Sequence, residues 1–152
     1  GELGEDGSVN STKMGVRCTG AGGFIDITQN AKKVVFLGTF TAGGAKYKFE
    51  NRKLEILQEG KIRKMVRQVA QLSFNGPMAR KKGQEVMVVT ERAVFQLVKD
   101  GVELIEIAPG IDLRTQILDK MDFKPIISKN LRVMDERLFV QDGPFGLKLK
   151  EK

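Results

Sequence analysis

The residues best suited to chemistry in this sequence are Gly20-Ala21-Gly22-Gly23, which stand just ahead of an apolar segment that begins at Phe24. Adjacent glycines let the backbone approach a ligand closely, and their successive N–H groups can point at one anion. Such groups can hold a phosphate, or an oxyanion that develops at a thioester carbonyl. Taken alone, the segment fits a plain structural turn better. It also lacks the dinucleotide pattern G-x-G-x-x-G, because Ile25 stands where the third glycine would be.

The sequence contains no histidine, and this absence excludes several kinds of catalysis. Ser-His-Asp and Cys-His catalysis both need an imidazole, as do histidine-bound metal sites. The single cysteine, Cys18, excludes an internal disulfide bond and a cysteine zinc cluster. We therefore expect no metal site and a reducing, cytoplasmic location, with Cys18 as a small buried residue.

Basic residues exceed acidic ones, 26 to 19, which gives a net charge of +7. This excess favours an anionic partner, and nucleic acid, an acidic membrane and a phosphorylated cofactor all fit that description. Nucleic-acid binding usually interleaves basic residues with aromatics or gathers them on one helix, whereas the basic runs here are dispersed. No apolar run reaches the ~20 residues needed to cross a bilayer. We therefore expect neither nucleic acid nor a membrane as a partner.

The pattern of apolar residues predicts a strand-rich α/β chain. Residues 33–40, KVVFLGTF, form a continuous run rich in β-branched and aromatic side chains. Such a run predicts a buried central strand that is covered on both faces. A glycine pair at 43–44 ends it. Further strands are expected at 8–10, 45–50, 54–58, 65–72, 85–91, 93–98, 102–107 and 131–134, with a hairpin over 45–58 and a tight turn at Asp100-Gly101.

Helix is expected in fewer places. Four apolar residues between positions 113 and 121 share one helical face, and Asp112 is a good N-cap, so a helix is predicted from Asp112 to about Met121. Residues 28–32 have room for one helical turn, and 75–82 are expected to be a loop. The sum is one mixed α/β domain over residues 1–140, followed by a tail at 141–152 that is either loose or a return strand.

Several short motifs, taken in order, add a family resemblance. Residues 6–13, DGSVNSTK, resemble the D/H-G-x-V-N-x-S/T segment of the family I coenzyme A (CoA) transferases, and residues 22–27, GGFIDI, resemble their G-G-x-x-D-L/I signature. Other segments are similar to the bacterial branch that acts on acetate, propionate, butyrate or acetoacetate: 33–43 (KVVFLGTFTAG), 90–92 (TER), 106–112 (EIAPGID), 121–126 (MDFKPI) and 134–137 (MDER). The ordered set covers about residues 2–139.

This resemblance implies a fold, an activity and partners. The fold is a mixed, strand-rich open sheet of the CoA-transferase and sugar-phosphate-isomerase superfamily, here the C-terminal (beta-type) domain, incomplete at its N-terminus. The activity is a ping-pong transfer of CoA between carboxylic acids, in which a glutamate carries first an acyl anhydride and then a CoA thioester. Coenzyme A is then a substrate, and no cofactor is bound permanently. The expected partners are acyl-CoA, a short-chain carboxylic acid, the N-terminal part of the enzyme and further copies in a homo-oligomer.

The resemblance also implies which residues form the site. The backbones of Gly22 and Gly23 would donate hydrogen bonds to the oxyanions. Phe24 would line the thioester site, and Asn10 would reach the same cleft.

Three further candidates follow the expected central strand. Thr41 and Gly43 stand where open α/β sheets bind ligands, at the end of a strand. Lys46 is a candidate contact for the CoA phosphates.

The nucleophilic glutamate is expected upstream of these residues. In the family it occupies an E-x-G motif several tens of residues before the G-G-x-x-D signature. Glu2-Leu3-Gly4 matches by letters but lies only about twenty residues before Gly22, so we interpret this match as chance. Two other hypotheses stay open: a non-catalytic module that senses a phosphorylated metabolite on the same scaffold, and nucleic-acid binding, which rests on net charge alone. The sequence leaves the acid substrate undetermined.

Overall fold

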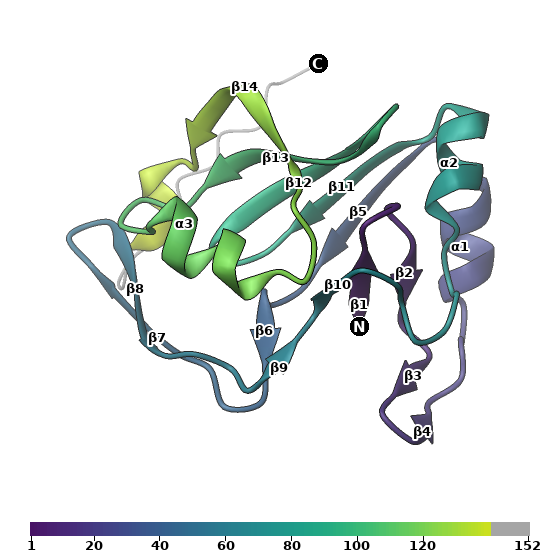
Figure 1. Cartoon of the computed structure of the whole chain (residues 1–152), viewed down its shortest axis with the longest axis horizontal. Helices are drawn as coiled ribbons and strands as arrows, with labels where there is room; N and C mark the ends of the chain where they lie inside the picture. The colour runs from purple at the N-terminus through teal and green to yellow at the C-terminus, as the bar shows by residue number, and fades with distance from the viewer. Residues whose placement is uncertain (141–152) are drawn as a thin grey trace, which may run out of the picture.

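A mixed five-stranded sheet organises this protein, as Figure 1 shows for the computed structural model, which describes residues 1–140. The strands lie in the order β14-β13-β12-β11-β5. The two inner pairs are antiparallel, and the outer pairs, β13 with β14 and β11 with β5, are parallel. Their bounds are β5 Lys33–Leu37, β11 Glu85–Val89, β12 Ala93–Val98, β13 Gly101–Ile107 and β14 Ile126–Val133. The mixed, strand-rich α/β class predicted from the sequence is confirmed.

The three-stranded meander β11-β12-β13 forms at the residues where the sequence predicts it. Apolar side chains of these strands pack into the hydrophobic core, where Ala93, Phe95 and Leu104 are fully enclosed. Gly101 has φ = +147°, a backbone conformation that residues other than glycine rarely adopt. This conformation accounts for the glycine in the tight turn ahead of β13. The last strand, β14, is confirmed but begins earlier than predicted.

The run at residues 33–40 forms an edge strand, so the prediction of a buried central strand is wrong for the described chain. Within residues 1–140, β5 pairs with β11 alone. Val34 is buried, but Val35 and Leu37 are 56% and 80% exposed. The strand also ends at Leu37, because Phe40 turns into the core and is fully buried.

The remaining strands form small ribbons around the main sheet. A three-stranded sheet has the order β10-β1-β2, and three two-stranded ribbons pair β3 with β4, β6 with β9 and β7 with β8. The bounds are β1 Glu2–Gly4, β2 Val9–Asn10, β3 Lys13–Met14, β4 Arg17–Cys18, β6 Thr41–Ala42, β7 Lys46–Glu50, β8 Lys53–Gln58, β9 Ile62–Arg63 and β10 Met65–Val66. The predicted hairpin over 45–58 is confirmed, with positive φ angles at Asn51 and Arg52. The strand predicted over 65–72 is wrong beyond Val66, because β10 has only the three-residue β1 as a partner.

The helices are short: α1 Phe24–Asn30, α2 Gly76–Lys82, α3 Leu113–Gln116, and the 3-10 helices η1 Leu118–Lys120 and η2 Glu136–Phe139. Figure 1 shows α1 and α2 together beside β5. The loop predicted at 75–82 is wrong: Asn75 accepts a hydrogen bond from the Met78 amide as an N-cap, and proline is tolerated in a first helical turn. The single turn expected at 28–32 is instead the longer helix α1, which starts earlier.

The predicted helix from Asp112 to Met121 is broken in two at Ile117. Asp112 caps α3 as expected, since its carboxylate accepts from the Thr115 amide at 2.7 Å. In an uninterrupted helix, the Gln116 carbonyl would accept a hydrogen bond from an amide one turn later. Here it accepts one from the buried Arg92 guanidinium at 3.1 Å. The chain therefore tightens into η1.

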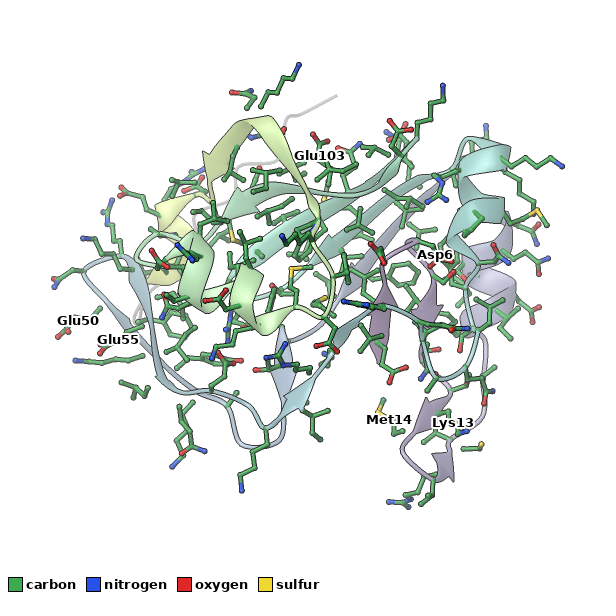
Figure 2. All side chains as sticks on the ribbon, in the orientation of Figure 1. Asp6, Lys13, Met14, Glu50, Glu55 and Glu103 are labelled. Atoms are coloured by element: carbon green, nitrogen blue, oxygen red, sulfur yellow. The ribbon has the colours of Figure 1, made fainter. Side chains whose placement is uncertain are left out.

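Charged side chains cover the outside of the molecule (Figure 2), with Glu50 and Glu55 on the β7-β8 hairpin and Lys13 on the projecting β3-β4 ribbon. Cys18, expected to be buried, is exposed on the same ribbon, because β3 and β4 contact little else. Across residues 1–140, no helix has the length and apolarity that a membrane crossing requires. The predicted tail, 141–152, lies outside the described residues.

Candidate functional site

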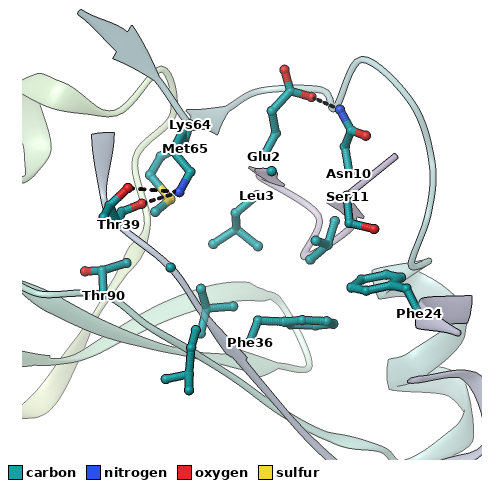
Figure 3. Close-up of a pocket in the computed structure, with 15 residues that line it drawn as sticks. Glu2, Leu3, Asn10, Ser11, Phe24, Phe36, Thr39, Lys64, Met65 and Thr90 are labelled. Carbon is teal, nitrogen blue, oxygen red and sulfur yellow. Dashed lines mark hydrogen bonds between the residues drawn. The ribbon is translucent and has the colours of Figure 1, made fainter. Parts of the chain in front are cut away.

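A pocket of about 160 Å³ lies at the carboxyl end of β5, where the chain leaves the main sheet (Figure 3). Its apolar walls include Leu3, Phe36 and Val88, and its polar rim includes Glu2, Asn10 and Lys64. Open α/β sheets bind ligands outside the carboxyl ends of their parallel strands, and β5 and β11 are parallel and both end here. The location is therefore the one that the fold favours for a ligand.

Two of the predicted site residues, Phe24 and Asn10, meet in this pocket although they come from different elements. Phe24 begins α1, and its ring stacks on that of Phe36 with centroids 5.6 Å apart. Gly22 and Gly23 form the loop immediately ahead of Phe24, and Gly22 has a positive φ of 51°. Their predicted role as hydrogen-bond donors stays a prediction.

Asn10 is fully buried, and its side-chain amide is hydrogen-bonded throughout. Its Nδ2 donates to Glu2 Oε2 at 2.8 Å and to the Lys13 carbonyl at 2.7 Å. Its Oδ1 accepts from the amides of Thr12 and Lys13. Asn10 therefore shapes the chain that leads from β2 into β3, and it holds Glu2 at the pocket rim.

Lys64 is a pocket residue that the sequence analysis did not single out, because it belongs to one of the dispersed basic runs. Its side chain is half-buried, and Nζ donates to the carbonyl of Thr39 and, at 3.3 Å, to the Thr39 hydroxyl. Burial lowers the pKa of the Lys64 ammonium, and the charge of Glu91 offsets only part of this effect. Among the described residues, no carboxylate pairs with Lys64, so the pocket rim carries a half-buried positive charge.

The other predicted residues lie away from the pocket. Thr41 is buried in β6, where its hydroxyl donates to Glu59. Gly43 lies at the turn beyond β6 with φ = +81°, and Lys46 is exposed at the start of β7. The prediction placed Thr41 and Gly43 at the end of a longer strand. Because β5 ends at Leu37, the residues that stand at its end and line the pocket are Gly38 and Thr39.

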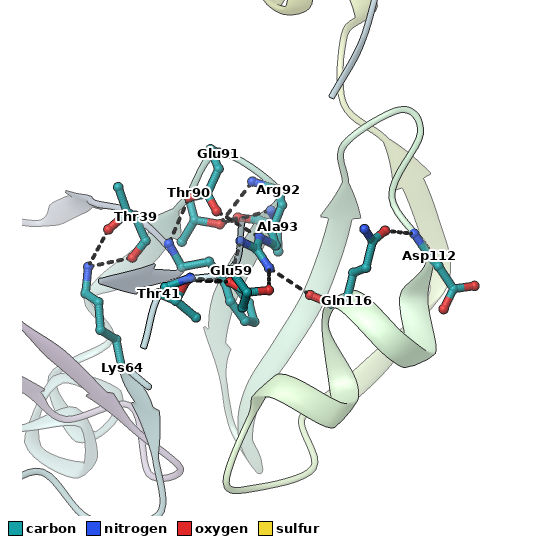
Figure 4. Close-up of polar contacts among 12 residues, drawn as sticks. Thr39, Thr41, Glu59, Lys64, Thr90, Glu91, Arg92, Ala93, Asp112 and Gln116 are labelled. Carbon is teal, nitrogen blue, oxygen red and sulfur yellow. Dashed lines mark hydrogen bonds and ion pairs between the residues drawn. The ribbon is translucent and has the colours of Figure 1, made fainter. Parts of the chain in front are cut away.

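A buried ionic cluster lies close to the chain that follows β5 (Figure 4). The Arg92 guanidinium, fully buried, donates to both carboxylate oxygens of Glu59, at 2.8 and 3.0 Å, and to Glu91 at 2.8 Å. It also lies 4.9 Å from the centroid of the Phe40 ring. The second oxygen of Glu91 accepts from the Phe40 amide at 2.8 Å. The cluster thereby ties the chain after β5 to the turn between β11 and β12.

The hydrogen bonds of the cluster favour the charged forms of Glu59 and Arg92. Burial raises the pKa of the Glu59 carboxyl, but hydrogen bonds from Arg92 and Thr41 outweigh it, so this pKa lies below its ordinary value. Burial likewise lowers the pKa of Arg92, but the two carboxylates outweigh it and raise the pKa overall. Across the described residues, no three acidic or cysteine side chains gather as a metal site would require.

Solved structures define the class of this fold. The chain aligns with the acyl-CoA transferase YdiF of Escherichia coli O157:H7, in its thioester complex with CoA, at a TM-score of 0.95 and 48% identity. The alignment covers 99% of this chain and 29% of that one. The decarboxylase AibA/AibB aligns at a TM-score of 0.63 and 19% identity over 88% of this chain and 48% of that one, a likeness of fold alone. The chain thus has the open, strand-rich α/β fold of a CoA-transferase domain.

Curated relatives give the family. The acetate CoA-transferase YdiF of Escherichia coli K12 is 48% identical over 150 residues, which are 99% of this chain and 28% of the relative. The caffeate CoA-transferase of Acetobacterium woodii is 47% identical over 140 residues, 89% of this chain and 26% of the relative. No protein-family model matches the chain. In sequence and fold, the chain corresponds to a C-terminal portion of a family I CoA-transferase, and it spans about 28% of the length of the relative from K12.

Proposed function

We propose that this chain forms one wall of the active site in a longer enzyme that transfers CoA between short-chain carboxylic acids. The observation that carries the proposal is the pocket at the carboxyl end of β5, where Phe24 and Asn10 meet below the glycine loop. The relatives, which include an acetate and a caffeate CoA-transferase, support the same reaction class.

The proposed reaction proceeds through a glutamyl-CoA thioester. A glutamate carboxylate attacks the thioester carbonyl of the acyl-CoA, and CoA leaves as a thiolate to give a mixed anhydride. The thiolate then attacks the glutamyl carbonyl, which releases the first acid as its carboxylate. The incoming carboxylate attacks the glutamyl-CoA, the thiolate departs again, and its attack on the new acyl carbonyl gives the product and restores the glutamate.

Each attack places negative charge on a carbonyl oxygen. We assign the N–H groups of Gly22 and Gly23 as donors to that oxygen, because their loop leads directly into Phe24 in the pocket wall. The ammonium of Lys64 stands on the opposite rim without a carboxylate partner in the described chain. We propose that it binds the carboxylate of the incoming acid.

We place the nucleophilic glutamate outside these 152 residues. Glu2 lines the pocket, but one oxygen of its carboxylate accepts hydrogen bonds from Asn10 and from the Ala70 amide, at 2.8 and 2.7 Å. These bonds fit a role in joining β1 to the segment after β10. The partners proposed for this chain are therefore the rest of the enzyme, acyl-CoA and a carboxylic acid, in a cytoplasmic homo-oligomer that holds no permanent cofactor.

The chain itself does not select the acid. An acetate and a caffeate CoA-transferase match it almost equally well, at 48% and 47% identity, although their acids differ greatly in size. We infer that the acyl pocket is formed mainly by the rest of the enzyme. The alternative of a non-catalytic module that senses a phosphorylated metabolite receives no support from these relatives.

The deciding experiment is the intact mass of the polypeptide after incubation with acetyl-CoA or propionyl-CoA, with and without borohydride. The 152-residue chain should form no adduct, and a longer polypeptide that contains it should gain one CoA, which borohydride removes. A CoA adduct on the 152-residue chain would contradict the location of the nucleophile and would make Glu2 the first residue to replace. Absence of an adduct and of CoA transfer with the longer polypeptide would refute the proposed activity.

A further inference from the structure

One peptide unit joins the buried ionic cluster to the rim of the pocket. The N–H group of Phe40 donates to Glu91 Oε2 at 2.8 Å, and the carbonyl of the same peptide, which belongs to Thr39, accepts from Lys64 Nζ. In a trans peptide these two groups point in opposite directions, so Glu91 and Lys64 bind opposite sides of it. The Thr39 hydroxyl adds a longer contact to Lys64 Nζ, at 3.3 Å (Figure 4).

The cluster leaves this peptide little freedom. The side chain of Glu91 is only 13% exposed, and its other oxygen accepts from the fully buried Arg92 guanidinium at 2.8 Å. The Phe40 ring is also fully buried and lies 4.9 Å from that guanidinium, so Phe40 is held through its side chain as well as its amide. The Thr39 carbonyl therefore has a fixed direction, and this direction places the Lys64 ammonium at the pocket rim.

The charge of Glu91 acts in the same sense as these hydrogen bonds. A carboxylate polarises the N–H group that it binds, and the carbonyl of the same peptide becomes a stronger acceptor. Burial lowers the pKa of the Lys64 ammonium, and the negative charge of Glu91 raises it in part. The amino group of Gly1, whose own pKa is lowered by burial and by the charge of Lys64, also faces this ammonium. Glu91 thus favours the charged form of Lys64, although no ion pair joins the two in the described chain.

We propose that Glu91 is a positioning residue for the acid site and acts through the peptide between Thr39 and Phe40 to hold the Lys64 ammonium toward the incoming carboxylate. The inference deepens the proposed function and rests on it, because the acid site is assigned there to Lys64. A purely structural role is the competing explanation, since Glu91 also binds the buried Arg92. The two roles are separable: a structural role predicts a loss of stability alone, whereas a positioning role also predicts a change at Lys64.

The titration of Lys64 tests this connection in the 152-residue chain, without any assay of CoA transfer. NMR of the lysine Cε resonances, assigned with Lys64→Arg, follows the ammonium directly. Glu91→Gln removes the charge and turns one accepting oxygen into an N–H donor that faces another donor. The pKa of Lys64 should then fall further below its ordinary value, because its burial is no longer offset by this carboxylate. An unchanged pKa would overturn the proposal.

Glu59→Gln is the matched control for this titration. Glu59 is the other carboxylate that binds Arg92, and it makes no contact with the peptide that holds Lys64. The substitution therefore removes a charge from the same cluster but should leave the pKa of Lys64 nearly unchanged. Equal decreases in the Glu59→Gln and Glu91→Gln variants would overturn the proposal, because the effect would then belong to the cluster as a whole.

A measurement on the unsubstituted chain keeps the test decisive if Glu91→Gln unfolds. The Phe40 amide and the carbonyl that binds Lys64 belong to one peptide, so the Phe40 amide resonance should shift as Lys64 titrates, with the same midpoint. The amide of Ala108, which donates to the Arg92 carbonyl at 2.8 Å, is the internal control and should not follow this titration. A Phe40 resonance that stays constant while Lys64 loses its proton would overturn the proposal.

The longer enzyme provides the functional test. Glu91→Gln should raise the KM for the acid by roughly 5-fold, about the contribution of one ordinary hydrogen bond, and leave the KM for acyl-CoA unchanged. Because the ammonium loses its proton at a lower pH in this variant, the KM for the acid should also begin to rise at a lower pH. In the Lys64→Met background, Glu91→Gln should raise this KM no further, since the residue through which it acts is gone.

The outcomes separate this inference from the proposed function. An additive increase in the KM of the double variant would overturn the inference, because Glu91 would then act independently of Lys64. Absence of CoA transfer by the longer enzyme would refute the proposed function, while the NMR titrations would still decide whether Glu91 holds Lys64.

Discussion

Replacement of Arg92 by methionine should destabilise this protein far more than the loss of an ordinary ion pair. The Arg92 side chain is fully buried, and it bonds both oxygens of Glu59, one oxygen of Glu91 and the Gln116 carbonyl. Methionine keeps apolar volume above the Phe40 ring but removes every one of these donors. The two carboxylates would then lie beside each other, mostly buried, without the guanidinium that now bonds both of them.

The size of this destabilisation depends on how exposed the Glu59 and Glu91 carboxylates are. Removal of one member of a buried ion pair costs about 3–5 kcal/mol, because the remaining charge is left uncompensated. The carboxylates of Glu59 and Glu91 keep 26% and 13% of their side-chain surface exposed, so water relieves part of the cost. We therefore expect a loss near the lower end, about 3 kcal/mol.

The assay is urea unfolding of the 152-residue chain at neutral pH, followed by circular dichroism. The matched control is Arg52→Met, which breaks an exposed pair: Arg52 lies 2.7 Å from Glu136, and the side chains are 58% and 61% exposed. Such a pair contributes about 0–1 kcal/mol. Arg92→Lys keeps the charge without the planar fork and should give an intermediate loss, which remains measurable if the methionine variant is unfolded.

The reasoning would be refuted if Arg92→Met and Arg52→Met lowered the free energy of unfolding by similar amounts. That result would mean that the cluster contributes no more than a surface contact. A loss for Arg92→Lys as large as that for Arg92→Met would instead assign the effect to the forked geometry, with the charge contributing little.

Three further predictions concern packing, pH and the proposed acid site. Gly76→Ala should lower the free energy of unfolding, measured in urea, by about 1–3 kcal/mol, because the added Cβ would lie 2.4 Å from the Asp6 carbonyl oxygen. In the control Gly23→Ala, the added Cβ would lie 3.4 Å from the flexible Ile27 side chain, and the free energy of unfolding should change little. The lowered pKa of Glu59 means that its contribution to stability is present above the ordinary value of 4.5 and is lost as the pH falls through the lower folded-state pKa. An acid titration of the unfolding free energy should therefore be shallower for Glu59→Gln, and an unchanged titration would contradict the assignment. In the longer enzyme, Lys64→Met should raise the KM for the acid by roughly 10-fold or more. The control Lys61→Met, at an exposed position, should leave this KM unchanged. Equal KM values for the two variants would exclude Lys64 from the acid site.

Elements governed by neighbouring residues were predictable from the sequence. The meander over β11 to β13 and the β7-β8 hairpin form where alternation and turn residues indicate, because both signals act within a few residues. The helix α2 could also have been found, since Asn75 and the following proline are start signals for a helix. The ordered motifs likewise identified the family before any contact between distant residues was known.

The candidate site was predictable only in part. Phe24 and Asn10 line the same pocket, and their roles at a thioester site stay predictions. Thr39 and Lys64 were missed because their meeting depends on residues 25 positions apart, and nothing local distinguishes Lys64 from a solvent-exposed lysine. Thr41 was placed at the end of a strand that in fact ends four residues earlier.

What the sequence determined alone is therefore the set of local elements and the family, because hydrophobic periodicity, turn residues and motifs are written in consecutive positions. What only the tertiary structure decided is the surroundings of each element. The apolar run of β5 is visible in the sequence. Its place at an edge of the sheet, with Val35 and Leu37 exposed, depends on which strands lie beside it. The charge of Arg92 is likewise visible in the sequence, whereas its burial between Glu59 and Glu91 results from segments that only folding brings together.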